Sequence, residues 1–133
     1  MVATRFQELV TWQLARELRC ALRPLLAKAE LEKDYEFKNQ LRGAARSITS
    51  NIAEGFPCSH IEFARFLEIA GRSVREVEDR LLEAIDSTMI TSNEAESSIR
   101  LIKRLTKAIS RLRAYLLSTP DPPSYRPKKS RRR

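Results

Sequence analysis

The chain has 133 residues, which is long enough for one domain with its own hydrophobic core and too short for two. Only three residues are glycine, and four of the six prolines lie between positions 120 and 127. A chain with so few helix breakers before position 120, and rich in Leu, Ala, Arg and Glu, is typical of an all-helical protein.

Charge and cysteine content indicate the environment and the kind of partner. The net charge is +8, and the segment from Pro120 onward carries six basic residues against one acid. This balance favours a polyanion, and nucleic acid is favoured over membrane because no predicted helix is both strongly apolar and basic. Cys20 and Cys58 form no Cys-x-x-Cys motif, and neither a secretory signal nor a long apolar run is present. We therefore expect a reduced, cytoplasmic protein with no membrane partner.

Capping signals divide the chain into four predicted helices. Three of the helices should begin with a capping box, in which a hydroxyl residue precedes Glu or Gln by three positions. The first helix should run from about 5 to 29, with its last turns kinked or interrupted by Pro24. The second should end at Gly55 in a left-handed cap, followed by Pro57, which cannot continue a helix. The expected caps are Thr4, Ser59 and Thr91 for the boxes, and Asp34 for the second helix.

Apolar side chains recur at helical spacing in all four segments, and each stripe covers about a third of a helix surface. Short connections make neighbouring helices antiparallel, so residues 1–119 are predicted to form an all-α, up-down-up-down four-helix bundle. Residues 120–133 have no apolar period and are predicted to form a disordered, basic C-terminal tail. The expected core consists of Phe6, Leu9, Leu14, Leu18, Leu22, Leu25, Phe37, Leu41, Ala44, Ala45, Ile48, Ile52, Phe63, Phe66, Leu67, Ala70, Val74, Val77, Leu81, Ile85, Ile102, Leu105, Ile109, Leu112 and Leu116.

Residues 40–55 combine small side chains with an unusual helix end. Small residues let another backbone approach closely, so this helix should lie at the centre of an assembly. Glu54 lies one residue before the helix end, where its charge meets the negative end of the helix dipole. We therefore expect Glu54 to have a specific partner, such as an Arg on a neighbouring helix. The candidate residues for oligomer or helix packing are Gly43, Ala44, Ala45, Ser47, Ser50, Asn51 and Glu54.

Basic residues concentrate on the fourth predicted helix, where no acid occurs between Glu96 and Asp121. Four of its cations fall within one narrow strip opposite the apolar face. A solvated helix face usually mixes signs, so the strip favours a nucleic-acid footprint over a merely soluble surface, although the second interpretation stays open. The candidate nucleic-acid-binding residues are Arg42, Arg46, Arg100, Lys103, Arg104, Lys107, Arg111, Arg126, Lys128, Lys129, Arg131, Arg132 and Arg133.

Residues for catalysis are scarce. His60 is the only histidine, so a catalytic triad or a His-containing metal site could only be built around that one ring. A thiol–imidazole pair with Cys58 would lack a group that orients the base. Glu76, Asp79 and Glu83 share a helix face, but no Glu-x-x-His motif accompanies them, and pairing with nearby arginines explains them better. We expect no enzyme activity, no cofactor and no metal.

The chain resembles the bacterial four-helix-bundle family of 23S rRNA intervening-sequence proteins, which includes the accessory variability determinants of diversity-generating retroelements. The resemblance covers about residues 5–117. It rests on Phe6, Leu9, Trp12, Ala15 and Leu18, on Gln40, on Ala44-Ala45-x-Ser47-Ile48-x-x-Asn51-Ile52-Ala53-Glu54-Gly55, on Phe63-x-x-Phe66-Leu67-x-Ile69-Ala70, and on Ser73-x-x-Glu76. The chain departs from the family pattern at Arg72 and at Phe56-Pro57.

The resemblance implies a ring-like homopentamer with a positively charged surface and no catalysis. Retroelement members of the family bind nucleic acid and associate with a reverse transcriptase. The first hypothesis is therefore a non-enzymatic scaffold that binds RNA or DNA through phosphates. The alternative hypothesis is a protein–protein adaptor or structural oligomer, whose basic face docks an acidic partner or keeps the oligomer soluble.

Overall fold

The computed structural model describes residues 3–127. Three of its long helices begin with a side-chain cap, as the sequence predicts. A carboxylate oxygen of Asp34 accepts the Phe37 N–H at 3.1 Å. The Ser59 hydroxyl accepts the Glu62 N–H at 3.2 Å. Thr91 forms a complete capping box with its partner three residues on. These caps begin α3 (Tyr35–Gly55), α4 (His60–Asp86) and α5 (Ser92–Ser118).

The first helix begins later than predicted, because Thr4 has another partner. Its N–H and its hydroxyl both bond the Glu8 carboxylate at 3.1 Å. This arrangement accompanies a short 3-10 turn, η1 (Phe6–Glu8), and α1 (Val10–Leu26) follows it without a side-chain cap. The predicted capping box at Thr4 is therefore wrong.

Pro24 lies inside α1, near its end, and has no N–H to contribute to the hydrogen-bond ladder. α1 ends two residues later, at Leu26, rather than at 29. A separate single turn, α2 (Ala29–Glu32), then leads into α3. Its buried Leu31 packs into the hydrophobic core.

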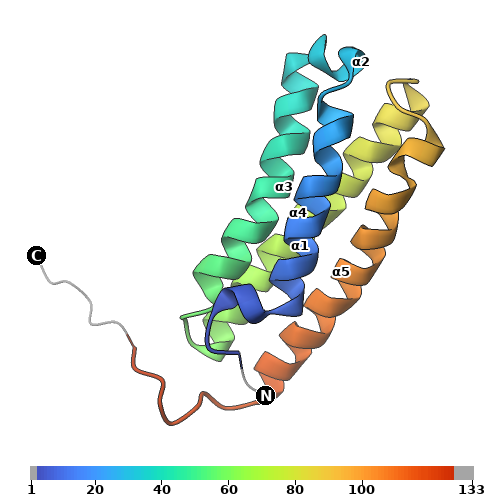
Figure 1. Cartoon of the computed structure of the whole chain (residues 1–133). Coiled ribbons are helices and arrows are strands. Elements are labelled where there is room, and N and C mark those ends of the chain that lie inside the picture. The colour runs from blue at the N-terminus through green and yellow to red at the C-terminus, as the bar shows by residue number, and fades with distance from the viewer. Residues whose placement is uncertain (1–2, 128–133) are drawn as a thin grey trace, which may run out of the picture.

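The four long helices of the described chain pack in a square, each against two neighbours (Figure 1). α3 lies against α1 and α4, and α5 lies against α4 and α1. Successive helices run in opposite directions, so the start of α1, the α3–α4 loop and the end of α5 lie at one end (Figure 1). The predicted antiparallel up-down-up-down bundle is confirmed.

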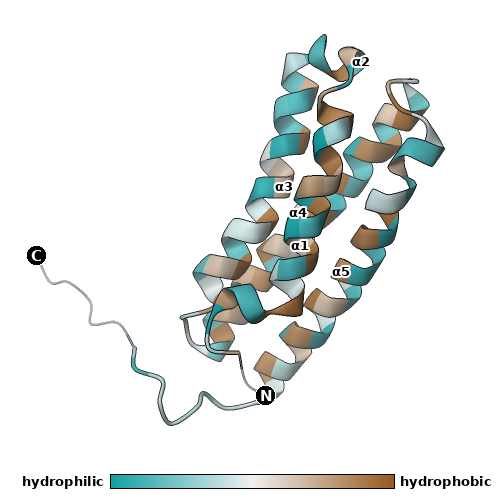
Figure 2. Ribbon diagram, viewed as in Figure 1, coloured by the Kyte–Doolittle hydropathy of each residue, from teal (hydrophilic) through white to brown (hydrophobic). Residues whose placement is uncertain are grey.

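The predicted apolar stripes face inward, and polar residues cover the outside (Figure 2). Most of the expected core residues are buried, and Leu18, Leu41, Ile48, Val77 and Leu105 are fully enclosed. A few expected core residues are only half-buried, because they lie at the ends or edges of the bundle. These are Phe6, Leu9, Phe66, Ile85 and Leu112.

Gly55 does not form the predicted left-handed cap. None of the described glycines has a positive φ, and α3 continues into Phe56, which keeps a right-handed conformation. The residue is buried against α4, where an added Cβ would lie 2.6 Å from the Phe66 Cβ and 2.8 Å from the Phe63 Cδ1. Glycine is therefore needed at this position for close approach of two helices.

α5 ends at Ser118, one residue before Thr119, after which the tail is predicted to start at Pro120. Beyond it, the described residues run back across the bundle end, in contacts that the sequence pattern does not predict. The Asp121 carboxylate accepts the His60 N–H at 2.6 Å, at the start of α4. Pro122 and Tyr125 line a pocket of about 460 Å³ together with Leu9, which precedes α1, and with apolar residues of α4 and α5. Asp121, Pro122 and Tyr125, which belong to the predicted tail, therefore lie against the end of the bundle.

Candidate nucleic-acid interface

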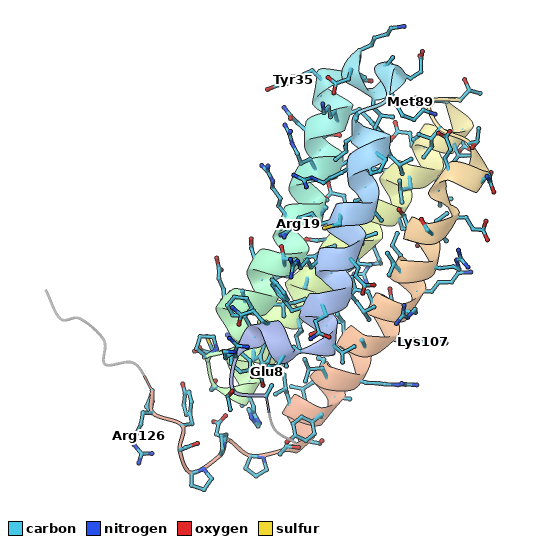
Figure 3. All side chains as sticks on the ribbon, in the orientation of Figure 1. Glu8, Arg19, Tyr35, Met89, Lys107 and Arg126 are labelled. Atoms are coloured by element: carbon cyan, nitrogen blue, oxygen red, sulfur yellow. The ribbon has the colours of Figure 1, made fainter. Side chains whose placement is uncertain are left out.

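Four cations form a straight ridge on the outer side of α5, and the name α5 ridge is used for Arg100, Arg104, Lys107 and Arg111. All four are exposed, and they lie opposite the buried positions of the same helix. Figure 3 shows Lys107 on the outer side of α5, away from the other helices. Among residues 3–127, no carboxylate forms an ion pair with any of the four. The ridge therefore presents uncompensated positive charge over ~16 Å of helix.

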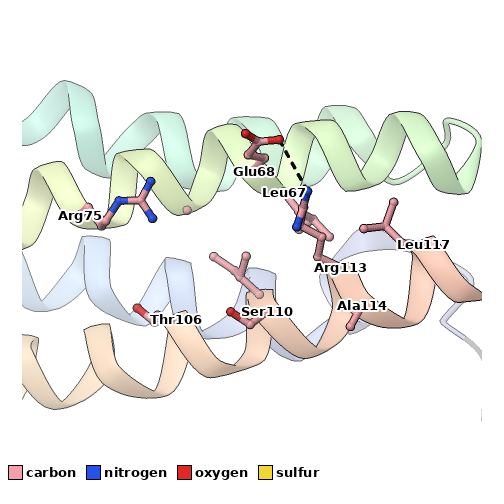
Figure 4. A pocket seen from close by; sticks show the side chains of 10 residues that line it. Leu67, Glu68, Arg75, Thr106, Ser110, Arg113, Ala114 and Leu117 are labelled. Carbon is pink, nitrogen blue, oxygen red and sulfur yellow. Dashed lines mark ion pairs between the residues drawn. The ribbon is translucent and has the colours of Figure 1, made fainter.

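Two other cations of α5 differ in their surroundings. Lys103 is exposed beside the ridge and has no ion pair within the described chain. Arg113 turns instead into a groove of about 520 Å³ between α4 and α5 (Figure 4). Its Nη2 lies 3.7 Å from a carboxylate oxygen of Glu68, which also pairs with Arg72 at 2.9 Å. Arg113 is therefore partly neutralised and does not belong to the ridge.

A second basic surface lies where α1 meets α3. Arg19 of α1, labelled in Figure 3, donates from its Nη1 to the Thr49 hydroxyl of α3 at 3.0 Å. Residues three or four positions apart lie on one helix face, so this contact brings further cations of both helices to the same place. We call this surface the α1/α3 seam. It consists of Arg16, Arg19 and Arg23 on α1 and of Arg42 and Arg46 on α3.

The sequence prediction included Arg42 and Arg46 but missed the three arginines of α1. Their spacing of three and four residues was a signal that they share one side of a helix. Arg42 is half-buried and donates to the Asn39 side chain at 2.7 Å, whereas Arg46 is exposed. In the described part of the chain, none of the five seam arginines forms an ion pair.

The predicted tail contributes one described cation. The exposed Arg126 donates to the backbone oxygens of Pro123 and Tyr125, at 2.7 and 3.0 Å. The remaining predicted cations of the tail lie outside the described residues. They are Lys128, Lys129, Arg131, Arg132 and Arg133.

The small residues of α3 divide between the interior and the surface. Ala44 and Ala45 are buried within the chain's own core. The Ser73 hydroxyl of α4 donates to the Ser47 hydroxyl at 2.9 Å, and Asn51 Nδ2 donates to the same oxygen at 3.0 Å. These residues hold α3 against α4. On the outer side of α3, Gly43 and Ser50 are exposed.

Glu54 lacks the partner that we expected within the chain. It is exposed, and among the described residues its carboxylate takes part in no hydrogen bond or ion pair. No Arg among residues 3–127 is therefore the partner expected for Glu54. A partner on another protomer stays a prediction.

The His60 and Cys58 side chains hold the bundle end together. His60 Nδ1 lies 2.8 Å from the Thr119 backbone oxygen, and Cys58 Sγ donates to the Glu54 backbone oxygen at 3.4 Å. Residues 3–127 contain no group of three or more His, Cys, Asp or Glu side chains that could hold a metal ion. Within the same residues, no helix combines the length and hydropathy needed to cross a membrane.

The fold and its surfaces define a basic, antiparallel four-helix bundle with uncompensated cations on α5 and along α1 and α3. The chain belongs to the family described as 23S rRNA-intervening sequence protein, whose family model matches residues 7–111. No curated protein and no solved structure matches the chain. The match covers all of α1, α3 and α4 and most of α5.

Proposed function

We propose that this protein is a non-enzymatic scaffold that binds RNA or DNA through phosphate groups. The observation that carries the proposal is the α5 ridge, in which four exposed cations face solvent without a carboxylate partner in the described chain. Successive side chains on such a helix face are ~5–6 Å apart, so they form a fixed array rather than a flexible polycation. Phosphate contacts of this kind position a nucleic acid without reading its bases.

The family supplies the expected assembly. We infer that the protein acts as a homo-oligomer, and the family resemblance predicts that this oligomer is a pentamer. A retroelement reverse transcriptase is a candidate partner. Several copies would repeat the ridge around the ring and would raise the affinity for a long polyanion through multivalency. The exposed Gly43 and Ser50 on α3 are the candidate contact positions, because the neighbouring alanines are already used inside the bundle.

Salt-dependent binding of a 20-base-pair RNA duplex and of an RNA–DNA hybrid tests the proposal. Replacing Arg104, Lys107 and Arg111 by Ala should lower the slope of log Kd against log salt by about three. At 0.1 M salt the affinity should fall on the order of a hundredfold. The matched control replaces Arg65, Arg72 and Arg75 of α4 by Ala and should change the slope far less, because acids surround these arginines. Equal effects of the two triple variants would refute the role of the ridge.

A truncation separates the bundle from the tail. Ending the chain after Pro127 removes Lys128, Lys129, Arg131, Arg132 and Arg133 and keeps the contact between Asp121 and His60. This variant should bind more weakly, with a smaller salt slope, but should still form a measurable complex. If truncation abolishes binding while the ridge variant keeps it, the bundle is not the binding surface. Absence of salt-dependent binding to any polyanion would favour the adaptor hypothesis.

A further inference from the structure

The α1/α3 seam differs from the α5 ridge because an aromatic side chain lies at one end of it. Trp12 is half-buried and precedes Arg16 by one helical turn. The Arg16 guanidinium carbon lies 5.7 Å from the centre of the Trp12 ring, and Phe6 meets the same ring edge-on at 5.3 Å. Among the described residues, the row of seam arginines thus ends at the Trp12 ring, which Arg16 and Phe6 both contact.

A hollow opens beside this ring on the surface of α1. Its volume is about 460 Å³, within the range of sites that hold small ligands. Most of the lining residues have polar side chains, among them the amides of Gln7 and Gln13 and one carboxylate, that of Glu17. The Gln13 amide donates to the Gln7 backbone oxygen at 2.9 Å, which fixes one wall. Arg16 and Trp12 both line the hollow, so a flat aromatic group that enters it would meet the indole together with the guanidinium that lies over its ring.

The cations of the seam remain available for an anion along its length. Arg16, Arg23 and Arg46 are exposed, and the described residues provide none of them with an ion pair. Because α1 runs from the Trp12 end toward α2 (Figure 1), Arg16 lies nearer the Trp12 end of the seam and Arg23 lies nearer α2. At the α2 end, Lys38 is already paired with Glu32. The positive surface therefore extends from Arg16, beside Trp12, toward the Lys38–Glu32 pair at the α2 end.

We propose that the α1/α3 seam binds single-stranded nucleic acid, with phosphates on its arginines and a base stacked at Trp12. This inference rests on the proposed function and adds a second surface, distinct from the α5 ridge, for a different form of the polymer. Arginine-lined grooves with an aromatic platform bind single strands without strong sequence preference, because every base has a face that can stack. A duplex keeps its bases paired and stacked, so it cannot use the Trp12 end.

Trp12 provides a direct test, because it is the only tryptophan of the chain. The full-length protein is titrated with 12-nucleotide oligo(U) and oligo(dT), and both tryptophan emission and the anisotropy of a labelled strand are recorded. Stacking should quench the emission along the same curve as the anisotropy. The oligonucleotide that quenches at lower concentration identifies the preferred sugar. A 20-base-pair RNA duplex should bind without comparable quenching.

Two double variants distinguish the seam from the rest of the surface. Replacing Arg23 and Arg46 by Ala should weaken oligo(U) binding at least tenfold at 0.1 M salt and leave the Trp12 neighbourhood intact. The matched control replaces Arg65 and Arg75 of α4 and should leave both the affinity and the quenching within twofold. The ridge variant at Arg104, Lys107 and Arg111 should still show quenching by oligo(U).

The outcomes separate this inference from the proposed function. The inference is overturned if single strands bind without quenching. It is also overturned if the seam variant and the α4 control lose the quenching equally. Duplexes that bind while single strands do not also overturn it, and the proposed function then stands. If no polyanion binds, both proposals fail. Quenching that depends on Arg23 and Arg46 supports the seam.

Discussion

Two glycines of α3 should respond in opposite ways to the same added methyl group. An Ala Cβ at Gly43 meets no heavy atom within 4 Å, whereas at Gly55 it would lie 2.6 Å from the Phe66 Cβ and 2.8 Å from the Phe63 Cδ1. Ala stabilises a helix relative to Gly by about 0.5–1 kcal/mol, and this gain is available at both positions. Forced overpacking typically costs about 1–3 kcal/mol.

For Gly43→Ala we expect a gain in unfolding free energy of about 0.5–1 kcal/mol. For Gly55→Ala the steric cost should exceed the helical gain, because the Phe66 Cβ is attached to the α4 backbone and cannot rotate away. The expected net loss is about 1–2 kcal/mol. Urea unfolding followed by circular dichroism at 222 nm measures both changes, and the slope with urea should stay unchanged.

Gly55→Asn distinguishes close packing from a left-handed helix end. Asn tolerates the left-handed conformation better than Ala, so a left-handed cap would make Asn the milder substitution. In the close contact with Phe63 and Phe66, the larger Asn side chain should be the more harmful of the two. A smaller loss for Gly55→Asn than for Gly55→Ala, or a stable Gly55→Ala protein, would refute the packing argument.

Three further predictions concern charges and assembly. Hydrogen bonds from Lys28 and the Thr91 N–H lower the pKa of Glu94. The stabilisation that Glu94 gives is therefore complete above the ordinary Glu pKa and is lost as the pH falls through the lowered value. The melting temperatures of wild type and Glu94→Gln should converge in that acidic range. Glu54→Gln should leave dilute protein within about 0.5 kcal/mol of wild type, and a larger loss only at concentrations that give oligomers would show an interfacial partner. Ser50→Arg should lower the mass in light scattering while the chain stays helical, whereas a Ser50→Ala control should not; a monomeric wild type at micromolar concentration would contradict this prediction.

Local signals were sufficient for most helix starts because a cap involves only neighbours in sequence. Asp34, Ser59 and Thr91 each satisfy an N–H three residues ahead, with no help from the rest of the fold. Thr4 carried the same signal and failed, because the Glu8 carboxylate lies within reach of both its N–H and its hydroxyl. A capping motif alone does not show which of two local partners prevails.

Helix ends were harder to predict because tertiary contacts determine them. Gly55 precedes a Pro-containing loop and looks like a left-handed cap, yet its lack of a side chain serves the contact with α4. The residue that does take a left-handed conformation is Thr88, with φ of 58°, after the end of α4. No sequence rule favours a β-branched residue there, because such residues rarely adopt positive φ.

The two candidate surfaces also differ in whether local sequence signals predict them. The α5 ridge was predictable, because one helix and its period of 3.6 residues determine which cations align. The α1/α3 seam requires knowing that α1 packs against α3 and at which register, and the Arg19–Thr49 contact supplies that information. Likewise, Ala44 and Ala45 looked available for assembly until their burial within the chain was known.

The arrangement of charge on α5 costs the free protein some stability. Arg100 and Arg104, Lys103 and Lys107, and Lys107 and Arg111 are each four residues apart, the spacing at which like charges destabilise a helix. At about 0.2–0.5 kcal/mol for each pair, the three pairs together cost on the order of 1 kcal/mol in low salt. A single Glu at position 107 would turn two of these repulsions into attractions, and its exposed site would accept one without any change in packing. Since local rules are broken mainly where function requires it, the missing acid argues that a bound polyanion supplies the negative charge.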